Sequence, residues 1–373
     1  MKVFAINTGS TSTKIALFNE EQCIFHRSIV YDPATLPSSL HDQLPLRRQQ
    51  ILDAALEAGI NLSECDAFSA RGGGLRPLTG GVYRIGEVLL RHASKSGPPE
   101  EVASLPLPHP ATLAAQLAAA LGTQYHRPCF VVNPPDVDEF CQLARVTGVR
   151  GIWRESRIHA LNQKEVALRY AHTVGLAYDQ LNLIVCHLGG GVSITAHERG
   201  KMIDSNDILN GDGPMAPTRC GTLTLRSVLS LADQQDPDAV KALASRTGGL
   251  MNHLGTADAR EIEQRIQRGD TYAKLIYDGM IYQIAKQAGA MAVALRGTVN
   301  QIILTGGMSH SQYLVEQLAP WISFIAPITV MAGEFEMEAL AAGALRVLHG
   351  EEQAKEYTGA PIWTAPVSTN QRR

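Results

Sequence analysis

Short apolar runs separated by turns of glycine and hydroxyl residues set the pattern of this chain. Residues 3–7 and 14–18 are two such runs, joined by the turn at 9–13. A third run at 23–30 follows, and the spacing of apolar positions then becomes helical over 47–58. The opening therefore predicts three strands followed by an amphipathic helix.

The rest of the chain predicts more strands and helices in alternation, and so an α/β fold. Strands are expected at 67–70 and 129–132, and helices at 111–121 and 155–174. A buried strand beginning at Gln301 is expected to run into a helix that starts near Ser309.

The opening pattern returns near the middle of the chain. Residues 183–197 again read as an apolar strand, a glycine-rich turn and an alternating strand. A recurrence near the midpoint favours two similar domains that face a cleft.

Three glycine-centred turns are candidate phosphate-binding sites, because backbone N–H groups and hydroxyls favour anions. An ordinary tight turn is the alternative for each of them. Neither a P-loop nor a dinucleotide-binding glycine pattern occurs in the sequence. The candidate residues are Gly9, Ser10, Ser12 and Lys14 in the first turn, Gly189, Gly190 and Gly191 in the second, and Gly306 and Gly307 in the third.

Composition narrows the class of protein. A length of 373 residues with 45% hydrophobic residues suits two domains, each with its own core. The net charge of −3 gives no reason to expect nucleic acid or an anionic membrane as a partner. The six cysteines are scattered without a C-x-x-C pair, so no zinc site or disulfide framework is indicated. No signal peptide or membrane span is recognised, and a cytoplasmic location is expected.

Six segments, in order, resemble the acetokinase group of the acetate and sugar kinase, Hsc70 and actin superfamily, and most closely its butyrate kinases. Their combination covers nearly the whole chain and is far more specific than any one of them. The segments are NTGSTSTK (7–14), RGGGLRPLTGGVY (71–83), IHALNQK (158–164), HLGGGVS (187–193), LTGGM (304–308) and GEFEMEAL (333–340).

The resemblance implies a fold and an activity. The fold would be two actin-like ATPase (ribonuclease H-like) domains with an interdomain cleft, at 1–145 and 146–339, with a C-terminal helix at about 340–373 returning to the first. The activity would be reversible, in-line transfer of a phosphoryl group from Mg-ATP to a short-chain fatty acid, butyrate or a branched relative, giving acyl phosphate and ADP. At least a homodimer is implied.

The resemblance also assigns roles to arginines and histidines. Arg71 matches a carboxylate-binding arginine, and Arg219 matches one that stabilises the transferring phosphoryl group. His109 and His159 match histidines that hydrogen-bond this group, and His187 matches a residue touching the ATP phosphates. A surface or structural role is the alternative for each, although fixed positive charge suits this chemistry on independent grounds.

Metal and nucleotide contacts follow from the same resemblance. Asn7 and Glu336 match positions associated with Mg²⁺, whose hard-oxygen preference they fit. Asp258 and Arg260 match a segment that contacts adenosine. Glu336 could instead favour a helix N-terminus, and Asp258 could cap a helix.

One position departs from the pattern of relatives. Asn133 stands where they carry an aspartate close to the metal. A carboxylate acceptor is already ionised at neutral pH, so the change removes charge rather than a needed base, and weakened activity or an altered metal preference is expected. Asp136 could take over the role.

Two alternatives to a carboxylate kinase stay open. A sugar or polyol kinase would need a base for its hydroxyl acceptor, against which Asn133 argues. A nucleotide-binding regulatory relative with impaired catalysis fits Asn133 but not the retained Arg71, Arg219, His159 and Glu336. The glycines at 72–74 are expected to leave volume beside Arg71 for a longer acyl chain.

Overall fold

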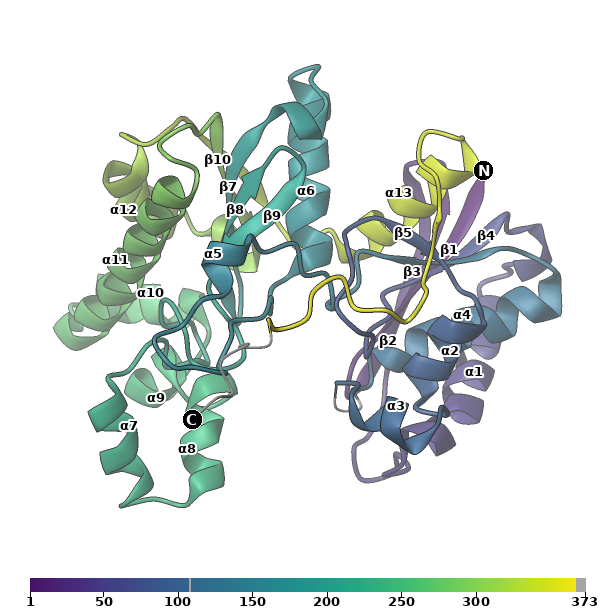
Figure 1. The fold of residues 1–373 in the computed structure, drawn as a ribbon, viewed down its shortest axis with the longest axis horizontal. Coiled ribbons are helices and arrows are strands. Elements are labelled where there is room, and N and C mark those ends of the chain that lie inside the picture. Colours follow the sequence, from purple (N-terminus) through teal and green to yellow (C-terminus); the bar gives the residue numbers. More distant parts are fainter. Residues whose placement is uncertain (107–108, 367–373) are drawn as a thin grey trace, which may run out of the picture. The chain divides into compact units, whose positions relative to one another are not determined.

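A computed structural model describes residues 1–106 and 109–366 of the chain. It divides into two compact units (Figure 1). The first unit contains residues 1–138 and the chain from Phe335 onward, and the second contains residues 139–334.

The first unit is built on a sheet with the strand order β12-β5-β6-β4-β1-β2-β3. β1, β2 and β3 form an antiparallel meander, whereas β4 pairs in parallel with β1 and β6 in parallel with β4. The strands are β1 (Lys2–Thr8), β2 (Ser12–Asn19), β3 (Gln22–Val30), β4 (Ala67–Ala70), β5 (Val82–Arg84), β6 (Cys129–Val132) and β12 (Lys355–Glu356).

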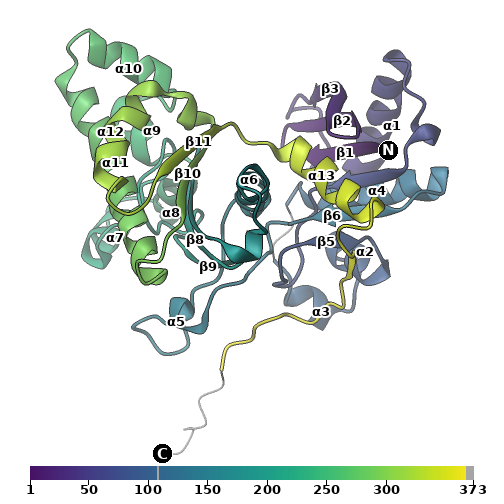
Figure 2. The same cartoon turned by 90° about the horizontal axis from the view of Figure 1, so that it is seen from above.

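Helices cover both faces of this sheet. Side chains alternate between the faces of a strand. Phe68 of β4 stacks on Tyr125 of α4, and the next residue, Ser69, donates a hydrogen bond to the carbonyl of Leu340 in α13. α4 and α13 therefore lie on opposite faces (Figures 1 and 2). The helices are α1 (Leu40–Glu57), α2 (Glu87–Ser94), α3 (Pro99–Ala103), α4 (Thr112–Tyr125) and α13 (Glu336–Leu348), with a 3₁₀ turn η1 (Leu62–Glu64).

The second unit repeats the same sheet topology. Its strand order is β11-β10-β7-β8-β9, in which β7, β8 and β9 form the meander and β10 and β11 pair in parallel. This order matches β6-β4-β1-β2-β3 of the first unit, so the predicted internal repeat is confirmed. The strands are β7 (Asn182–Leu188), β8 (Val192–Glu198), β9 (Lys201–Ser205), β10 (Gln301–Gly306) and β11 (Ile328–Ala332).

The core of the second unit lies between its sheet and the helices α11 and α12. Ile184, Cys186 and Leu188 of β7 pack into this core, whereas α6 lies on the other face of the sheet (Figure 2). None of the helices in the described ranges is long and apolar enough to cross a lipid bilayer. The helices are α5 (Gln142–Arg145), α6 (Ala160–Thr173), α7 (Leu225–Ala232), α8 (Pro237–Ser245), α9 (Gly249–Leu254), α10 (Ala259–Gln267), α11 (Thr271–Ala294) and α12 (Gln312–Ile322), with the 3₁₀ turns η2 (Tyr178–Gln180) and η3 (Gly307–His310).

Helix boundaries differ from the predicted ones in two places near the middle of the chain. The helix expected at 155–174 begins only at Ala160, because the preceding segment is held by other parts of the unit. Trp153 forms a bridge with Val146 at the end of α5, and Arg154 binds Asp204 of β9. The helix expected near Ser309 is the 3₁₀ turn η3, and α12 follows it.

Two further boundaries need correction. α1 begins at Leu40, well before residue 47, and accommodates Pro45 in its first two turns. The helix expected at 340–373 is α13, which ends at Leu348 before Gly350 with its positive φ of 77°. The chain then becomes extended and adds β12 beside β5, while 367–373 lies outside the described residues.

Gly343 lets α13 approach the sheet closely. A Cβ at this position would lie 2.6 Å from Cγ1 of Val132 in β6, whereas a Cβ on Gly289 of α11 would meet no atom within 4 Å. Alanine has a higher helix propensity than glycine. Alanine substitutions at the two sites therefore distinguish the effect of packing on stability from the effect of helix propensity.

We expect Gly343→Ala to lower the free energy of unfolding by about 1–3 kcal/mol, since overpacking outweighs the propensity gain. The matched Gly289→Ala variant should raise it by about 0.5–1 kcal/mol or leave it unchanged. Thermal unfolding followed by circular dichroism measures both. Equal stabilisation by the two alanines would contradict the close contact.

Candidate functional site

In the first unit, the carboxyl ends of three parallel strands meet at one edge of the sheet. Ile6 of β1 lies opposite Ala70 of β4, and Ala70 lies opposite Val131 of β6. The residues that follow, Asn7, Arg71 and, after Val132, Asn133, therefore leave the sheet along the same edge. Ligands of open α/β sheets bind at such edges.

Asn7, Arg71 and Glu336 form one cluster at this edge. The buried Asn7 donates its Nδ2 to Oε2 of Glu336 at 2.7 Å, and Nη1 of Arg71 lies 3.5 Å from Oε1 of the same carboxylate. Glu336 is also the first residue of α13, where the helix dipole favours a negative charge. The predicted metal residues thus lie beside the predicted carboxylate-binding arginine.

His109 belongs to the same neighbourhood. Desolvation lowers the pKa of His109, and the positive charge of Arg71 lowers it further. Its Nδ1 accepts a hydrogen bond from the backbone N–H of Ala111 at 3.1 Å. The neutral ring therefore carries its hydrogen on Nε2 and can donate from that atom.

The first hairpin turn is held from behind by Arg47, a residue to which the sequence assigned no role. Its guanidinium is fully buried and donates to the carbonyls of Ser10 and Ser12 at 3.2 and 3.1 Å. It also binds Oε1 of Gln43 and lies over the ring of Tyr31, 4.4 Å from the centroid.

The sequence did contain a signal for this residue. Arg47 lies on the buried stripe of α1 together with Gln43, Ile51, Ala54 and Ala55. A charged residue at a core position of an amphipathic helix needs a polar partner inside the fold. Here that partner is the backbone of the candidate phosphate turn.

The turn itself is tight and open to solvent. Gly9 donates its backbone N–H to the carbonyl of Ser12 at 2.8 Å, and Ser10 is exposed. Lys14 lies on β2 directly opposite Asn7. The hydrogen bonds from Arg47 to the carbonyls of Ser10 and Ser12 restrain the conformation of the turn.

Asn133 has a structural role at the end of β6. It adopts a φ of +38°, which asparagine tolerates better than most residues. Its Oδ1 accepts the backbone N–H of Gly81 at 2.7 Å, and its own N–H donates to the carbonyl of Gly81. An aspartate would accept the same hydrogen bond and add a second charged oxygen.

The glycines after Arg71 do not leave the expected volume. A Cβ on Gly72 would lie 2.6 Å from a methyl group of Val131, and one on Gly74 would lie 2.7 Å from a methyl group of Thr112. The expectation of empty space is therefore wrong at both positions. These glycines serve close packing and positive φ values of 69° and 72°.

The second unit gathers its predicted residues in the same way. His187 of β7 lies opposite Thr305 of β10, so the glycine turn at 189–191 and Gly306 share one edge of the sheet. The turn is closed by the N–H of Gly189, which donates to the carbonyl of Gly191. The rings of His159 and His187 stack, with centroids 3.9 Å apart.

Arg219 lies against this glycine turn. Its guanidinium occupies the position that a Cβ on Gly191 would take. Thr218 donates its hydroxyl to the carbonyl of Gly190 at 3.0 Å and so ties the arginine loop to the turn. Nε and Nη1 of Arg219 are buried without a hydrogen-bond partner among the described residues.

Such unpaired donors are costly. A buried unsatisfied polar group costs about 1–3 kcal/mol, and more when charged. Burial lowers the pKa of Arg219, and the carboxylate of Asp207 partly opposes this shift. A bound anion would satisfy the unpaired nitrogens, so the site suits a phosphate oxygen.

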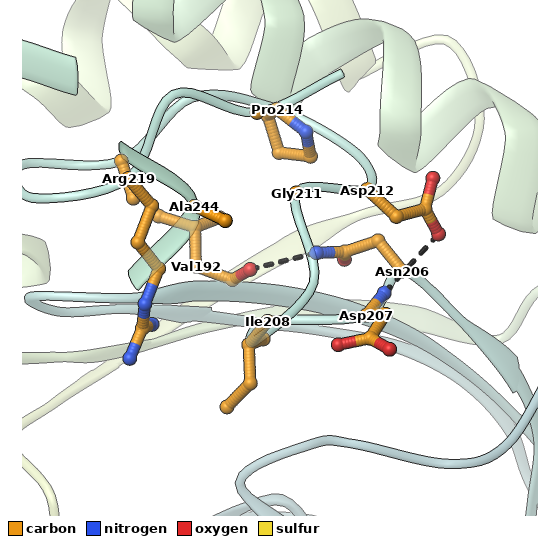
Figure 3. A pocket seen from close by; sticks show the side chains of 11 residues that line it. Val192, Asn206, Asp207, Ile208, Gly211, Asp212, Pro214, Arg219 and Ala244 are labelled. Atoms are coloured by element: carbon orange, nitrogen blue, oxygen red, sulfur yellow. Dashed lines mark hydrogen bonds between the residues drawn. The ribbon is translucent and has the colours of Figure 1, made fainter. Parts of the chain in front are cut away.

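A small pocket beside Arg219 is lined by both polar and apolar residues (Figure 3). Asn206 lines it and bridges to β8 by donating to the carbonyl of Val192 and accepting the N–H of Ile194. Asp207 faces the pocket from the next position. Sequence reasoning assigned no role to either residue, and their loop carries no motif that would have marked them.

Two of the predicted nucleotide residues, Asp258 and Arg260, lie at the start of α10. Asp258 caps α10 and forms an exposed ion pair with Arg260, whose hydrogen bond lowers the pKa of Asp258 to about 2. Gly307, by contrast, follows β10 with open space around the position of its missing side chain.

The oxygen atoms of the first cluster fit a magnesium ion. Asn7 directs its Nδ2 to Glu336, so its Oδ1 is left to face another group. Mg²⁺ is usually held by one or two protein oxygens and several waters. Within residues 1–106 and 109–366 no cluster of three histidine, cysteine or acidic residues could hold a metal ion.

Comparisons with known proteins bear on the fold and on part of the chain. Residues 145–325 match the family model of the acetokinase family. The acetate kinase of Porphyromonas gingivalis is 19% identical, with a TM-score of 0.74 over 93% of this chain and 99% of that one. The acetate kinase of Entamoeba histolytica is 17% identical, with a TM-score of 0.73 over 92% and 99%.

A third solved structure shares the fold. A propionate kinase from Francisella tularensis is 17% identical, with a TM-score of 0.70 over 92% of this chain and 98% of that one. These identities show the fold alone. The predicted fold class, two similar domains of the actin-like ATPase type, is confirmed.

We expect Arg47→Met to lower the free energy of unfolding by about 2–3 kcal/mol, because the carbonyls of Ser10 and Ser12 and the buried hydroxyl of Thr13 lose a charged donor. The matched Arg48→Met variant removes a guanidinium that binds one exposed side chain, Gln124, and should change stability by less than about 0.5 kcal/mol. Chemical denaturation measures both. Amide exchange at Gly9 should accelerate only in Arg47→Met; unchanged exchange there would contradict the support of the turn.

Proposed function

We propose that the protein transfers the γ-phosphoryl group of ATP to a short-chain fatty acid, giving an acyl phosphate and ADP. The observation that carries this proposal is Arg219, whose two unpaired, buried nitrogens lie against the glycine turn. A guanidinium so held stabilises the negative charge on a transferring phosphoryl group.

Arg71 is the residue that binds the acceptor carboxylate in this proposal. Its planar guanidinium suits both oxygens of a carboxylate, and it pairs at the strand edge with Glu336, which Asn7 in turn binds. Nε2–H of His109 adds a neutral donor beside it. A fatty acid has a pKa of about 4.3, like glutamate, so the acceptor is ionised at neutral pH and needs no general base.

The second unit takes the nucleotide in this proposal. The N–H groups of Gly190 and Gly191 and the ring of His159, which stacks on His187, supply donors to phosphate oxygens. Asn7 and Glu336 would hold Mg²⁺, which supplies positive charge to the phosphates when bound. The matching family model at 145–325 includes all of these second-unit residues, which supports the assignment.

Butyrate or a branched relative is the acceptor that we propose. The support is the segment at 71–83, since the packed glycines at 72 and 74 add none. Each buried CH₂ is worth about 0.8 kcal/mol, so selectivity between neighbouring acids should be roughly tenfold or less.

A coupled assay of ADP formation with Mg-ATP and acetate, propionate, butyrate or isobutyrate tests the function. We expect turnover that depends on both Mg²⁺ and acid and is faster with butyrate or isobutyrate than with acetate. A clear acetate preference would overturn the substrate proposal. ATP binding without phosphorylation of any acid would favour a regulatory protein instead.

The control for this assay is a pair of glycine variants. Gly191→Ala should displace Arg219 and lower kcat by about 100-fold or more, the size of effect seen when a charge-stabilising donor is lost. Gly279→Ala in α11 adds the same methyl group into open space and should leave kcat unchanged. Equal rates in both variants would remove Arg219 from the mechanism.

Asn133→Asp tests the departure from the pattern of relatives. We expect the variant to fold as the parent does, because aspartate also accepts the N–H of Gly81. Its added charge should lower the Mg²⁺ concentration for half-maximal activity and raise kcat. Magnesium titrations of both proteins measure this, and Asn133→Ala distinguishes the charge from the hydrogen bond. A weaker magnesium response in Asn133→Asp would contradict the metal proximity.

A further inference from the structure

Helix α6 begins directly after His159, and its first turn carries two amide side chains. Asn162 and Gln163 are both buried, and each binds a different histidine. Neither amide has a role in the function proposed above. Their hydrogen-bond partners determine where the hydrogens of the stacked pair His159 and His187 lie.

Asn162 fixes His187. Its Nδ2 donates to the backbone carbonyl of Glu334, and a carbonyl can only accept, so its Oδ1 faces Nδ1 of His187 at 2.8 Å. This amide oxygen can only accept a hydrogen bond. Nδ1 of His187 therefore carries a hydrogen.

Gln163 is oriented by the same argument. Its Nε2 lies 3.1 Å from the carbonyl of Ser193 and 3.4 Å from that of Val185, so the nitrogen faces these two acceptors. Oε1 then faces Nε2 of His197 at 3.0 Å. Nε2 of His197 must donate, and the orientation of the amide is settled.

The hydrogen bond between His197 and Tyr178 agrees with this orientation of Gln163. Burial lowers the pKa of His197 well below its usual value, and the charge of Lys164 lowers it further. The ring is therefore neutral, and its Nδ1 accepts the hydroxyl hydrogen of Tyr178 at 2.7 Å. Burial also raises the pKa of Tyr178, which keeps that hydroxyl protonated.

The hydroxyl of Ser193 lies between Gln163 and His159. This buried hydroxyl oxygen lies 3.0 Å from Nε2 of Gln163, an amide nitrogen that cannot accept a hydrogen bond, and 2.9 Å from Nδ1 of His159. Among the described residues the hydroxyl hydrogen has no other acceptor than this ring nitrogen. A buried donor left unpaired is costly, so the hydroxyl donates to Nδ1 of His159.

We propose that Ser193 and Gln163 are positioning residues that fix His159 as the neutral tautomer with its hydrogen on Nε2, while Asn162 fixes the opposite, Nδ1–H form in His187. His159 can then present an N–H donor without carrying a charge. Its use toward a transferring phosphoryl group rests on the proposed function, whereas the tautomers themselves do not.

The test is an NMR measurement on the full-length protein with ¹⁵N-labelled histidine at pH 7.5. Two-bond ¹H–¹⁵N correlation spectra distinguish the two neutral tautomers and the imidazolium. His159→Gln and His187→Gln identify the two signals by their loss. We expect Nε2–H for His159 and Nδ1–H for His187; an Nδ1–H or imidazolium pattern for His159 would overturn the proposal.

Ser193→Ala removes the hydroxyl and should turn the His159 signal into a mixture of both tautomers. Ser205→Ala, a buried serine of the same sheet that binds Thr195 and Ile194, is the matched control and should leave the signal unchanged. An unchanged His159 signal in Ser193→Ala would contradict the proposal even if the protein is otherwise native.

Kinetics separate this inference from the proposed function. Ser193→Ala should lower kcat by about 2- to 10-fold, in proportion to the population of the competent tautomer, with little change in the KM for ATP. The expected tautomers in a protein without turnover would contradict the proposed function and support the hydrogen-bond assignment. A shifted tautomer with unchanged kcat would remove His159 from the mechanism.

Discussion

Each sheet of this protein is organised by one strand that pairs on both sides in different directions. β1 and β7 each pair antiparallel with the second strand of a hairpin and parallel with the strand that follows later in the chain. This double pairing brings the hairpin turn and the ends of the parallel strands to one edge. Asn7 and Arg71 meet there in the first unit, and His187 and Gly306 in the second.

Buried polar groups behind these edges determine what they can bind. In the first unit Arg47 occupies the carbonyls of the turn. In the second, Gln163 and Ser193 orient a histidine. Each of these polar groups is hydrogen-bonded, as burial requires. Arg219 differs from these groups, since two of its buried nitrogens are unpaired in the described part of the chain, which suits an anionic ligand.

The sequence predicted most strands and the internal repeat because both depend on local apolar periodicity. The ends of helices were less predictable: α6 begins late because Arg154 ties the preceding segment to Asp204, a contact between residues far apart in sequence. Arg47 was missed for the same reason, since its partners lie on a distant turn. The space beside Gly72 is filled by Val131 of the neighbouring strand β6, and the sequence alone does not show which strands are neighbours.

Phosphate is expected to move directly between a nucleotide and a carboxylate, and the reverse reaction tests this transfer most directly. ³¹P NMR of the protein with butyryl phosphate, ADP and Mg²⁺ follows every phosphorus species at once. ATP should appear as fast as the acyl phosphate disappears, and Arg219→Leu should abolish both changes. Conversion of butyryl phosphate to inorganic phosphate without ATP, or no conversion at all, would contradict it.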